Sequence, residues 1–152
     1  MELIDAIAIG LLVGFFFYER VGLSPGGFVV PGYLALYLDR PLMILSTLAL
    51  SLLAFGLVLL LSRVTILYGR RRFILTILVG FALQWLYKVV AVKTQFVPVE
   101  IDTIGYIIPG LIANEMGRQR ILPTLGSLAI VTVLVRLILI LIGYFKTGGF
   151  IL

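Results

Sequence analysis

The nine-residue stretch GFVVPGYLA at Gly27–Ala35 decides the fold, because it returns as GYIIPGLIA at Gly105–Ala113. The two stretches lie 78 residues apart; four of their nine positions are identical, and the other five exchange one apolar residue for another. The same offset pairs Arg40 with Arg118. Similarity at one constant offset is typical of duplicated units. We therefore predict two copies of one unit, each with a span, a Pro-Gly segment and a second span.

The composition around these stretches is that of a membrane protein. Of the 152 residues, 62% are hydrophobic and 12% are charged, with a mean hydropathy of +1.22, whereas about 25% of the residues in a soluble domain are charged. A helix that crosses a bilayer needs roughly 20 mostly apolar residues, and four segments approach or exceed that length: 3–18, 41–61, 73–92 and 121–145. We predict an all-α, multi-pass integral membrane protein with about four transmembrane helices in a single domain, 1–152.

A basic segment between the second and third predicted spans separates the two repeats of this domain. Residues 63–72 carry four arginines, and short loops rich in arginine and lysine tend to face the cytoplasm. We therefore predict a first repeat at 1–62, a basic cytoplasmic loop at 63–72 and a second repeat at 73–152. With four spans, both chain termini lie on the same side of the membrane as this loop.

Each Pro-Gly segment is apolar yet unsuited to an unbroken span. Proline disfavours the α conformation in the residue before it and fits the first turn of a helix, so we expect short helices at 33–38 and 111–116. We predict that each is a re-entrant or surface half-helix; the alternative is a complete crossing, with three spans per unit and inverted copies. The segments are either tight turns that cap helices, or a pair that faces an ion or polymer, because helix N-termini attract anions.

One charge lies well inside a predicted span. Arg136 is in the fourth span, where an arginine costs about 2.5 to 3.5 kcal/mol on insertion scales and usually faces the bundle interior or a water-filled cavity. It either forms a buried pair with Asp5 or acts as a positive point that attracts an anion. Gln84 and Lys88, four residues apart on the third span, either extend this polar track or, for Lys88, reach the membrane surface.

Several classes of chemistry are excluded. The sequence has no Cys and no His, which rules out a catalytic thiol, a disulfide, a Ser-His-Asp triad and the usual zinc sites. Glu100 and Asp102 are the closest carboxylate pair, interpreted as part of a solvated loop, and no P-loop motif is present. We predict no catalytic residue, metal site or cofactor in this chain. The net charge of +5 suits a surface of anionic lipid, and the scattered basic residues do not suggest nucleic acid.

Four motifs in order along the chain carry a resemblance to a known family: ERVG at 19–22, VVPGYL at 29–34, ILYGRRRF at 66–73 and IPGLIAN at 108–114. The sequence closely resembles the PgsC/CapC family, the integral membrane subunit of the bacterial poly-γ-glutamate synthase complex of capsule biosynthesis. The resemblance implies a bacterial cell membrane location and two partners. One is a PgsB/CapB-like amide ligase of the Mur-ligase type, which uses ATP and Mg²⁺; the other is a PgsA/CapA-like membrane-anchored subunit.

The residues and the resemblance together suggest a non-catalytic subunit that anchors the ligase and helps to pass the anionic polymer across the membrane. The predicted polymer path comprises Pro31, Gly32, Tyr33, Lys88, Pro109, Gly110, Asn114 and Arg136. The predicted docking surface for the ligase comprises Tyr68, Arg70, Arg71 and Arg72, although an arginine run is also typical of a lipid-headgroup anchor.

Two other functions and one assembly question stay open. The chain is alternatively an autonomous transporter or channel for small anions or ions. It is alternatively a membrane-embedded transferase that uses Glu19, Glu115 or Asp102. A homo-oligomer is compatible with either function.

Overall fold

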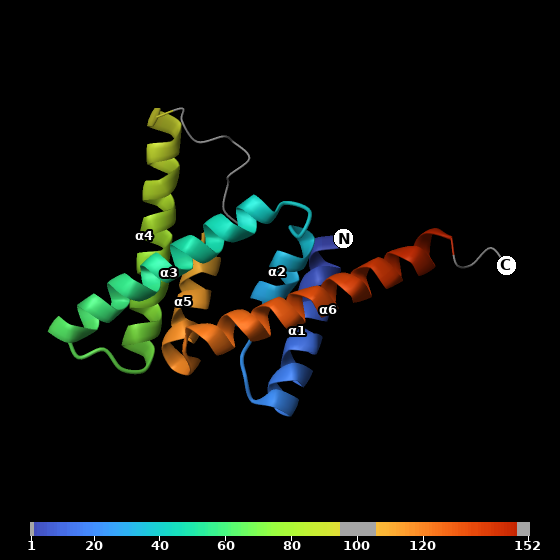
Figure 1. Cartoon of the computed structure of the whole chain (residues 1–152), viewed down its shortest axis with the longest axis horizontal. Helices are drawn as coiled ribbons and strands as arrows, with labels where there is room; N and C mark the ends of the chain where they lie inside the picture. Colours follow the sequence, from blue (N-terminus) through green and yellow to red (C-terminus); the bar gives the residue numbers. More distant parts are fainter. Residues whose placement is uncertain (1, 95–105, 149–152) are drawn as a thin grey trace.

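The computed structural model describes residues 2–94 and 106–148, and these form six helices and no strand. The helices are α1 (Glu2–Val21), α2 (Val30–Leu36), α3 (Pro41–Val64), α4 (Arg70–Thr94), α5 (Ile108–Gln119) and α6 (Ile121–Thr147) (Figure 1). The prediction of an all-α protein is confirmed. By length and composition, α3, α4 and α6 are able to cross a membrane. Gly105 of the second Pro-Gly motif, Glu100 and Asp102 lie outside the described residues.

The two short helices begin at equivalent positions of the Pro-Gly motifs, Val30 and Ile108, each directly before the proline. The predicted helices 33–38 and 111–116 therefore start three residues too late. A residue before proline is biased away from the helical conformation, but both of these side chains are buried in the core, Val30 fully. Burial outweighs the local bias, and the proline ring fits the first turn, where its missing N–H has no partner to lose.

The arginine run belongs to a helix rather than to a loop. Arg70 begins α4, α3 extends to Val64, and only residues 65–69 connect them. The predicted loop 63–72 is therefore wrong at both ends. Gly69 has a φ of +62°, a conformation that glycine adopts without steric cost, and it turns the chain directly into α4.

The first Pro-Gly segment runs back along α1 instead of turning round within the molecule. Phe28 lies against Gly14 of α1, and Gly32 lies against Ala6 near the start of α1. Residues 22–29 form a non-helical connection, with bends at 26–29, and a non-helical chain is able to cover more length per residue than a helix, which rises about 1.5 Å per residue. The segment thus passes from one end of α1 toward the other. Whether it is a re-entrant or surface half-helix, or a complete crossing of a membrane, stays a prediction.

The second segment follows α4 in the same way. The Tyr106 ring lies 5.5 Å from the Phe81 ring, and Gly117, near the end of α5, lies beneath the side chain of Arg72 in the first turn of α4. In Figure 1, α1 runs downward and α2 upward, whereas α4 runs upward and α5 downward. The corresponding helices of the two halves therefore run in opposite directions.

Glycine is required where each short helix meets the long helix beside it. A Cβ on Gly32 would lie 2.5 Å from the carbonyl oxygen of Ala6, and a Cβ on Gly110 would lie 2.8 Å from the Cα of Ile77. Both clashes are with backbone, which has no rotamer to change. Small residues that allow backbones to approach closely are typical of helix packing in membranes.

The core lies between the two short helices. Each of them contacts the first helix of its own half and the third helix of the other half: α2 packs against α1 and α6, and α5 packs against α4 and α3. The largest buried cluster comprises Val30, Leu34, Met43, Ile108, Ile112, Met116 and Leu128. The Pro-Gly segments thus form the centre of the molecule.

Apolar side chains cover much of the surface, especially the C-terminal halves of α3 and α6. The accessible surface is 9987 Å², whereas a compact soluble protein of 16.8 kDa exposes about 7,600 Å². This extended, apolar surface is compatible with a membrane protein.

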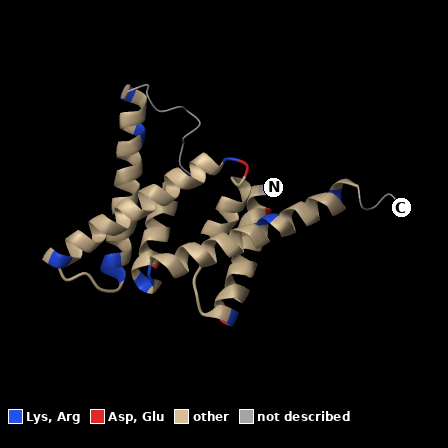
Figure 2. Ribbon diagram, in the orientation of Figure 1, with Lys and Arg blue, Asp and Glu red and all other residues tan. Residues whose placement is uncertain are grey.

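In Figure 2, a group of basic residues lies along the lower edge of the molecule, and the other charged residues are spread over the rest of it. Seven arginines lie where α1, α3 and α5 end and where α4 and α6 begin: Arg20, Arg63, Arg70, Arg71, Arg72, Arg118 and Arg120. We call this the arginine end. The start of α1 lies at the opposite end, next to the end of α6, where Asp5 and Lys146 are 3.7 Å apart. The start of α1 and the end of α6 thus lie together, away from the arginine end. On which side of a membrane the termini lie stays a prediction.

Candidate functional site

The prolines and glycines of the predicted polymer path are buried. Pro31, Gly32, Pro109 and Gly110 lie inside the core, against α1 and α4 respectively. Their observed contacts are packing contacts that fix the positions of α2 and α5. Whether polymer passes beside them stays a prediction.

Tyr33 and Asn114, which follow these residues on the two short helices, also belong to the interior. Tyr33 is partly buried against the core cluster, and Asn114 is 8% exposed. Asn114 is a buried polar side chain on α5, next to Glu115, which is also 8% exposed and accepts a hydrogen bond from Arg118 at 3.2 Å. Glu115, a carboxylate of the transferase alternative, is thus held in an ion pair.

Lys88 lies far along α4 from the arginine end. Its Nζ atom is 4.6 Å from the centre of the Tyr106 ring, a distance at which a cation is attracted to the face of an aromatic ring. Gln84, one turn earlier, is fully buried. Lys88 is partly buried, and whether the two residues form a continuous polar track stays a prediction.

Arg136 is paired with a residue that the sequence did not suggest. Its Nη2 atom donates to both oxygens of Asp39, at 3.0 and 2.8 Å, and its Nη1 atom donates to the carbonyl oxygen of Ala35 at 3.2 Å. The alternative of a pair with Asp5 is wrong, since Asp5 lies near Lys146. A guanidinium that holds a carboxylate through two contacts and a carbonyl through a third is fixed in orientation.

A pocket of about 260 Å³ adjoins this ion pair. Arg136, Lys146 and Asp5 line it, together with apolar residues of α2 and α6 such as Leu36 and Leu139. Two cations therefore face one cavity, and each is accompanied by an aspartate. Lys88 lies on α4, whereas residues of α1, α2 and α6 line this pocket, so the structure does not bring the two cations of the predicted path together.

The residues predicted to dock the ligase lie on one surface of the arginine end. Tyr68 is 81% exposed, and Arg70 and Arg71 are exposed as well. Arg72 differs from them: it is half-buried, and its guanidinium lies over Gly117 and leaves no room there for a Cβ. Arg72 therefore connects α4 with α5, whereas the other three side chains are available to a partner.

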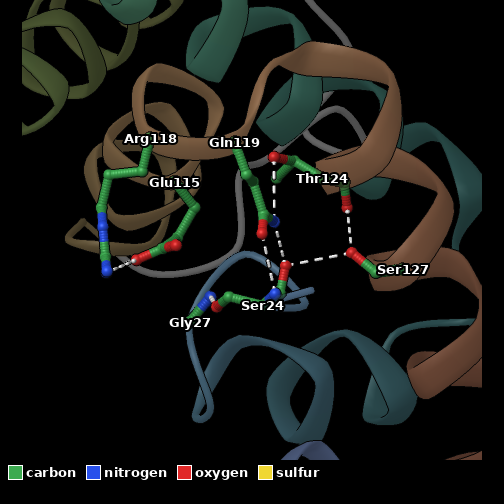
Figure 3. A network of polar contacts seen from close by, with 7 residues as sticks. All are labelled: Ser24, Gly27, Glu115, Arg118, Gln119, Thr124 and Ser127. Atoms are coloured by element: carbon green, nitrogen blue, oxygen red, sulfur yellow. Dashed lines mark hydrogen bonds and ion pairs between the residues drawn. The ribbon is translucent and has the colours of Figure 1, made fainter. Parts of the chain in front are cut away.

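A polar network joins the two halves at the same end (Figure 3). The backbone N–H of Ser24 donates to Gln119 Oε1 at 2.8 Å, and Gln119 Nε2 donates to the carbonyl oxygen of Ser24 and to Thr124 Oγ1. Ser127 Oγ lies 3.0 Å from the same carbonyl oxygen. The side-chain amide of Gln119 thus both accepts from and donates to the backbone of Ser24. These contacts link the α1–α2 connection to α5 and α6.

Sequence reasoning missed both Asp39 and this network. Asp39 stands next to Arg40 and resembles an ordinary loop charge, but it meets Arg136 across 97 residues. Gln119 occupies the position that corresponds to Pro41 in the 78-residue repeat. The exchange of a proline for a glutamine, directly after the constant offset of Arg40 and Arg118, was the available signal.

Comparison with known proteins identifies the family of this chain. Residues 9–125 match the family model described as "Capsule biosynthesis CapC". The chain belongs to the CapC family. The capsule biosynthesis protein CapC of Bacillus anthracis is 40% identical to it over 127 residues, which cover 83% of this chain and 85% of the relative. The PGA biosynthesis protein CapC of Bacillus subtilis (strain 168) is 39% identical over the same shares. No solved structure matches the chain.

Membership of the CapC family confirms the resemblance drawn from the four motifs and supports a role in capsule polymer synthesis. The match to the CapC model includes both Pro-Gly motifs, the arginine run, Asp39 and Gln119, and it ends before Arg136 and Lys146. The cations of the pocket thus lie outside the matched region, on the second half of α6.

Proposed function

We propose that this chain is a non-catalytic membrane subunit of a poly-γ-glutamate synthesis and export complex. It anchors an ATP-dependent amide ligase at the arginine end and helps the anionic polymer across the bilayer. The observation that carries this proposal is the collection of seven arginines at one end of a CapC-family chain. ATP and Mg²⁺ belong to the ligase, and a PgsA/CapA-like subunit completes the assembly.

The proposed membrane arrangement has two inverted units of three crossings each. Gly32 and Gly110 are 78 residues apart, and the glycines that contact them, Gly10 and Gly80, are 70 apart. Equivalent contacts in the two halves, together with the opposite directions of α1 and α4, support an internal repeat. Six crossings place both termini on the side opposite the arginine end.

The arginine end then faces the cytoplasm, since arginine-rich connections are retained there. This is where a ligase finds ATP. Arg and Tyr are enriched at protein interfaces and among the residues that dominate binding energy, and Tyr68, Arg70 and Arg71 are exposed there. They form the proposed docking surface.

The polymer itself explains why a membrane subunit is needed. Poly-γ-glutamate carries about one negative charge per residue at neutral pH, because its α-carboxyl groups stay free, and an isolated charge in hydrocarbon is very costly. The CapC protein of B. subtilis is named for PGA biosynthesis, which supports this polymer as the cargo here. Arg136 and Lys88 are the cations proposed to attract it.

Replacing Arg70 and Arg71 together with alanine tests the docking surface. We expect ligase recovered with the affinity-tagged chain from detergent extract to fall about tenfold, because two interface arginines that contribute about 0.7 kcal/mol each remove about 1.4 kcal/mol. The control is Arg40→Ala with Lys93→Ala, which removes two exposed cations at the opposite end. Equal ligase recovery with both double variants contradicts the docking proposal.

A small-ion transporter is the second candidate function. The observation in its favour is the pair of oppositely directed, Pro-Gly-broken segments, which are typical of secondary transporters. Ion flux in liposomes that contain this chain alone would support it. Polymer export that depends on the ligase, without such flux, supports the capsule function.

A further inference from the structure

The guanidinium of Arg136 already holds a carboxylate, and this carboxylate belongs to the chain itself. Both oxygens of Asp39 accept from Arg136 Nη2, at 3.0 and 2.8 Å. Arg recognises any carboxylate through its planar array of donors, whether the group belongs to a side chain or to a ligand. Asp39 therefore occupies the position at Arg136 that a carboxylate ligand would take.

The two partners differ in how firmly they are held. The Arg136 side chain is 28% exposed and is also anchored to the carbonyl oxygen of Ala35. The Asp39 side chain is 75% exposed and lies in the short connection between α2 and α3. An ion pair with one partner this exposed contributes little, so Asp39 is able to leave while Arg136 stays in place.

The adjoining pocket contains a second pair of a basic residue and an aspartate. Lys146 and Asp5 line it along with Arg136, and the Lys146 and Asp5 side chains are 3.7 Å apart, 70% and 43% exposed. Each cation in the pocket thus has an aspartate that is loosely placed beside it. The cavity of about 260 Å³ leaves room for a carboxylate next to Arg136.

We propose that Asp39 is an internal substitute for a carboxylate of the polymer, and that the Arg136 pocket is a binding subsite for that chain. When no polymer is present, Asp39 occupies the guanidinium; a polymer carboxylate takes its place and Asp39 turns toward solvent. The identity of the ligand rests on the proposed function. The pocket lies at the end opposite the arginine end, where the proposed orientation has the chain leave the membrane.

Removing either charge of this pair should have opposite effects on polymer binding. Asp39→Asn should bind fluorescently labelled poly-γ-glutamate about three- to fivefold more tightly than wild type, since the internal competitor is lost. Arg136→Gln should bind it about tenfold more weakly, since a charge-assisted contact is lost. The double variant should behave like Arg136→Gln. Binding is measured by fluorescence anisotropy on the purified full chain at low salt.

Arg40→Gln is the matched control, because Arg40 is exposed beside Asp39 and has no ion-pair partner within the described residues. Size-exclusion profiles and melting temperatures identify a variant that misfolds. If both Asp39→Asn and Arg136→Gln weaken polymer binding to the same degree, the ion pair has only a structural role and the proposal is wrong. If wild type and Arg136→Gln bind the polymer equally well, the proposed subsite is wrong but the proposed function is unaffected. If the wild type does not bind the polymer at all, the proposed role of this chain in passing the polymer is contradicted as well.

Discussion

Gly32→Leu is expected to prevent stable folding of the membrane domain. Even a Cβ at this position would lie 2.5 Å from the carbonyl oxygen of Ala6 and 3.0 Å from the Cα of Ile7. Overpacking a core costs about 1 to 3 kcal/mol and occasionally more, and we expect the upper end here because the neighbouring atoms are backbone. Fluorescence-detected size exclusion after heating should show most of the protein lost under conditions that leave wild type intact.

The second unit offers an independent repetition of this experiment. A Cβ on Gly110 would lie 2.8 Å from the Cα of Ile77, so Gly110→Leu should destabilise the protein to a similar degree. Gly56→Leu on α3 is the control, since no atom of another helix lies within 4 Å of its Cβ position among the described residues. If Gly56→Leu lowers the melting temperature as much as Gly32→Leu, close packing of the short helices is not the cause.

Gln119→Leu should produce the second large loss of stability. The change leaves the buried backbone N–H of Ser24 without its acceptor, whereas the Thr124 hydroxyl still donates to the carbonyl oxygen of Arg120 at 2.7 Å. A buried polar group without a partner costs about 1 to 3 kcal/mol, so we expect a loss in this range. The loss should appear as a lower melting temperature of the purified chain.

Two variants separate the hydrogen bonds from the shape of the side chain. Gln119→Glu keeps the shape but replaces the donor Nε2 with an acceptor opposite the Ser24 carbonyl oxygen, so it should destabilise nearly as much. Ser46→Ala removes a hydroxyl that donates only within its own helix, to the carbonyl oxygen of Leu42, and should have little effect. A Gln119→Glu protein as stable as wild type would contradict the proposed role of the network.

The sequence predicted those features that local pattern determines. Long apolar runs indicated α3, α4 and α6, and proline in the first turn indicated two short helices, although burial of Val30 and Ile108 moved their starts. Local pattern did not predict the path of the Pro-Gly segments, because a re-entrant segment and a crossing segment are equally apolar. The close contacts of Gly10 with Gly32 and of Gly80 with Gly110 show that α2 packs against α1 and α5 against α4, and Gly10 and Gly80 are 70 residues apart rather than 78.

Polar and charged groups with distant partners could not be placed from sequence. Asp39 and Arg136 are 97 residues apart, and Ser24 and Gln119 are 95 apart. Neither separation leaves a periodic signal on a helix. Arg72 is a further example, because identical neighbours in the sequence have different environments in the structure. It is one of three adjacent arginines, yet only its side chain turns inward over Gly117.

Photo-crosslinking during polymer synthesis tests most directly whether this chain handles the polymer. A photoreactive residue at Leu139, which lines the Arg136 pocket, should form an adduct with poly-γ-glutamate in cells that express the ligase. The same residue at Leu78, an exposed apolar position on α4, should form none, and the Leu139 adduct should disappear when the ligase is inactive. Adducts of equal yield at both positions, or none at Leu139 while polymer reaches the medium, would contradict passage of the polymer along this subunit.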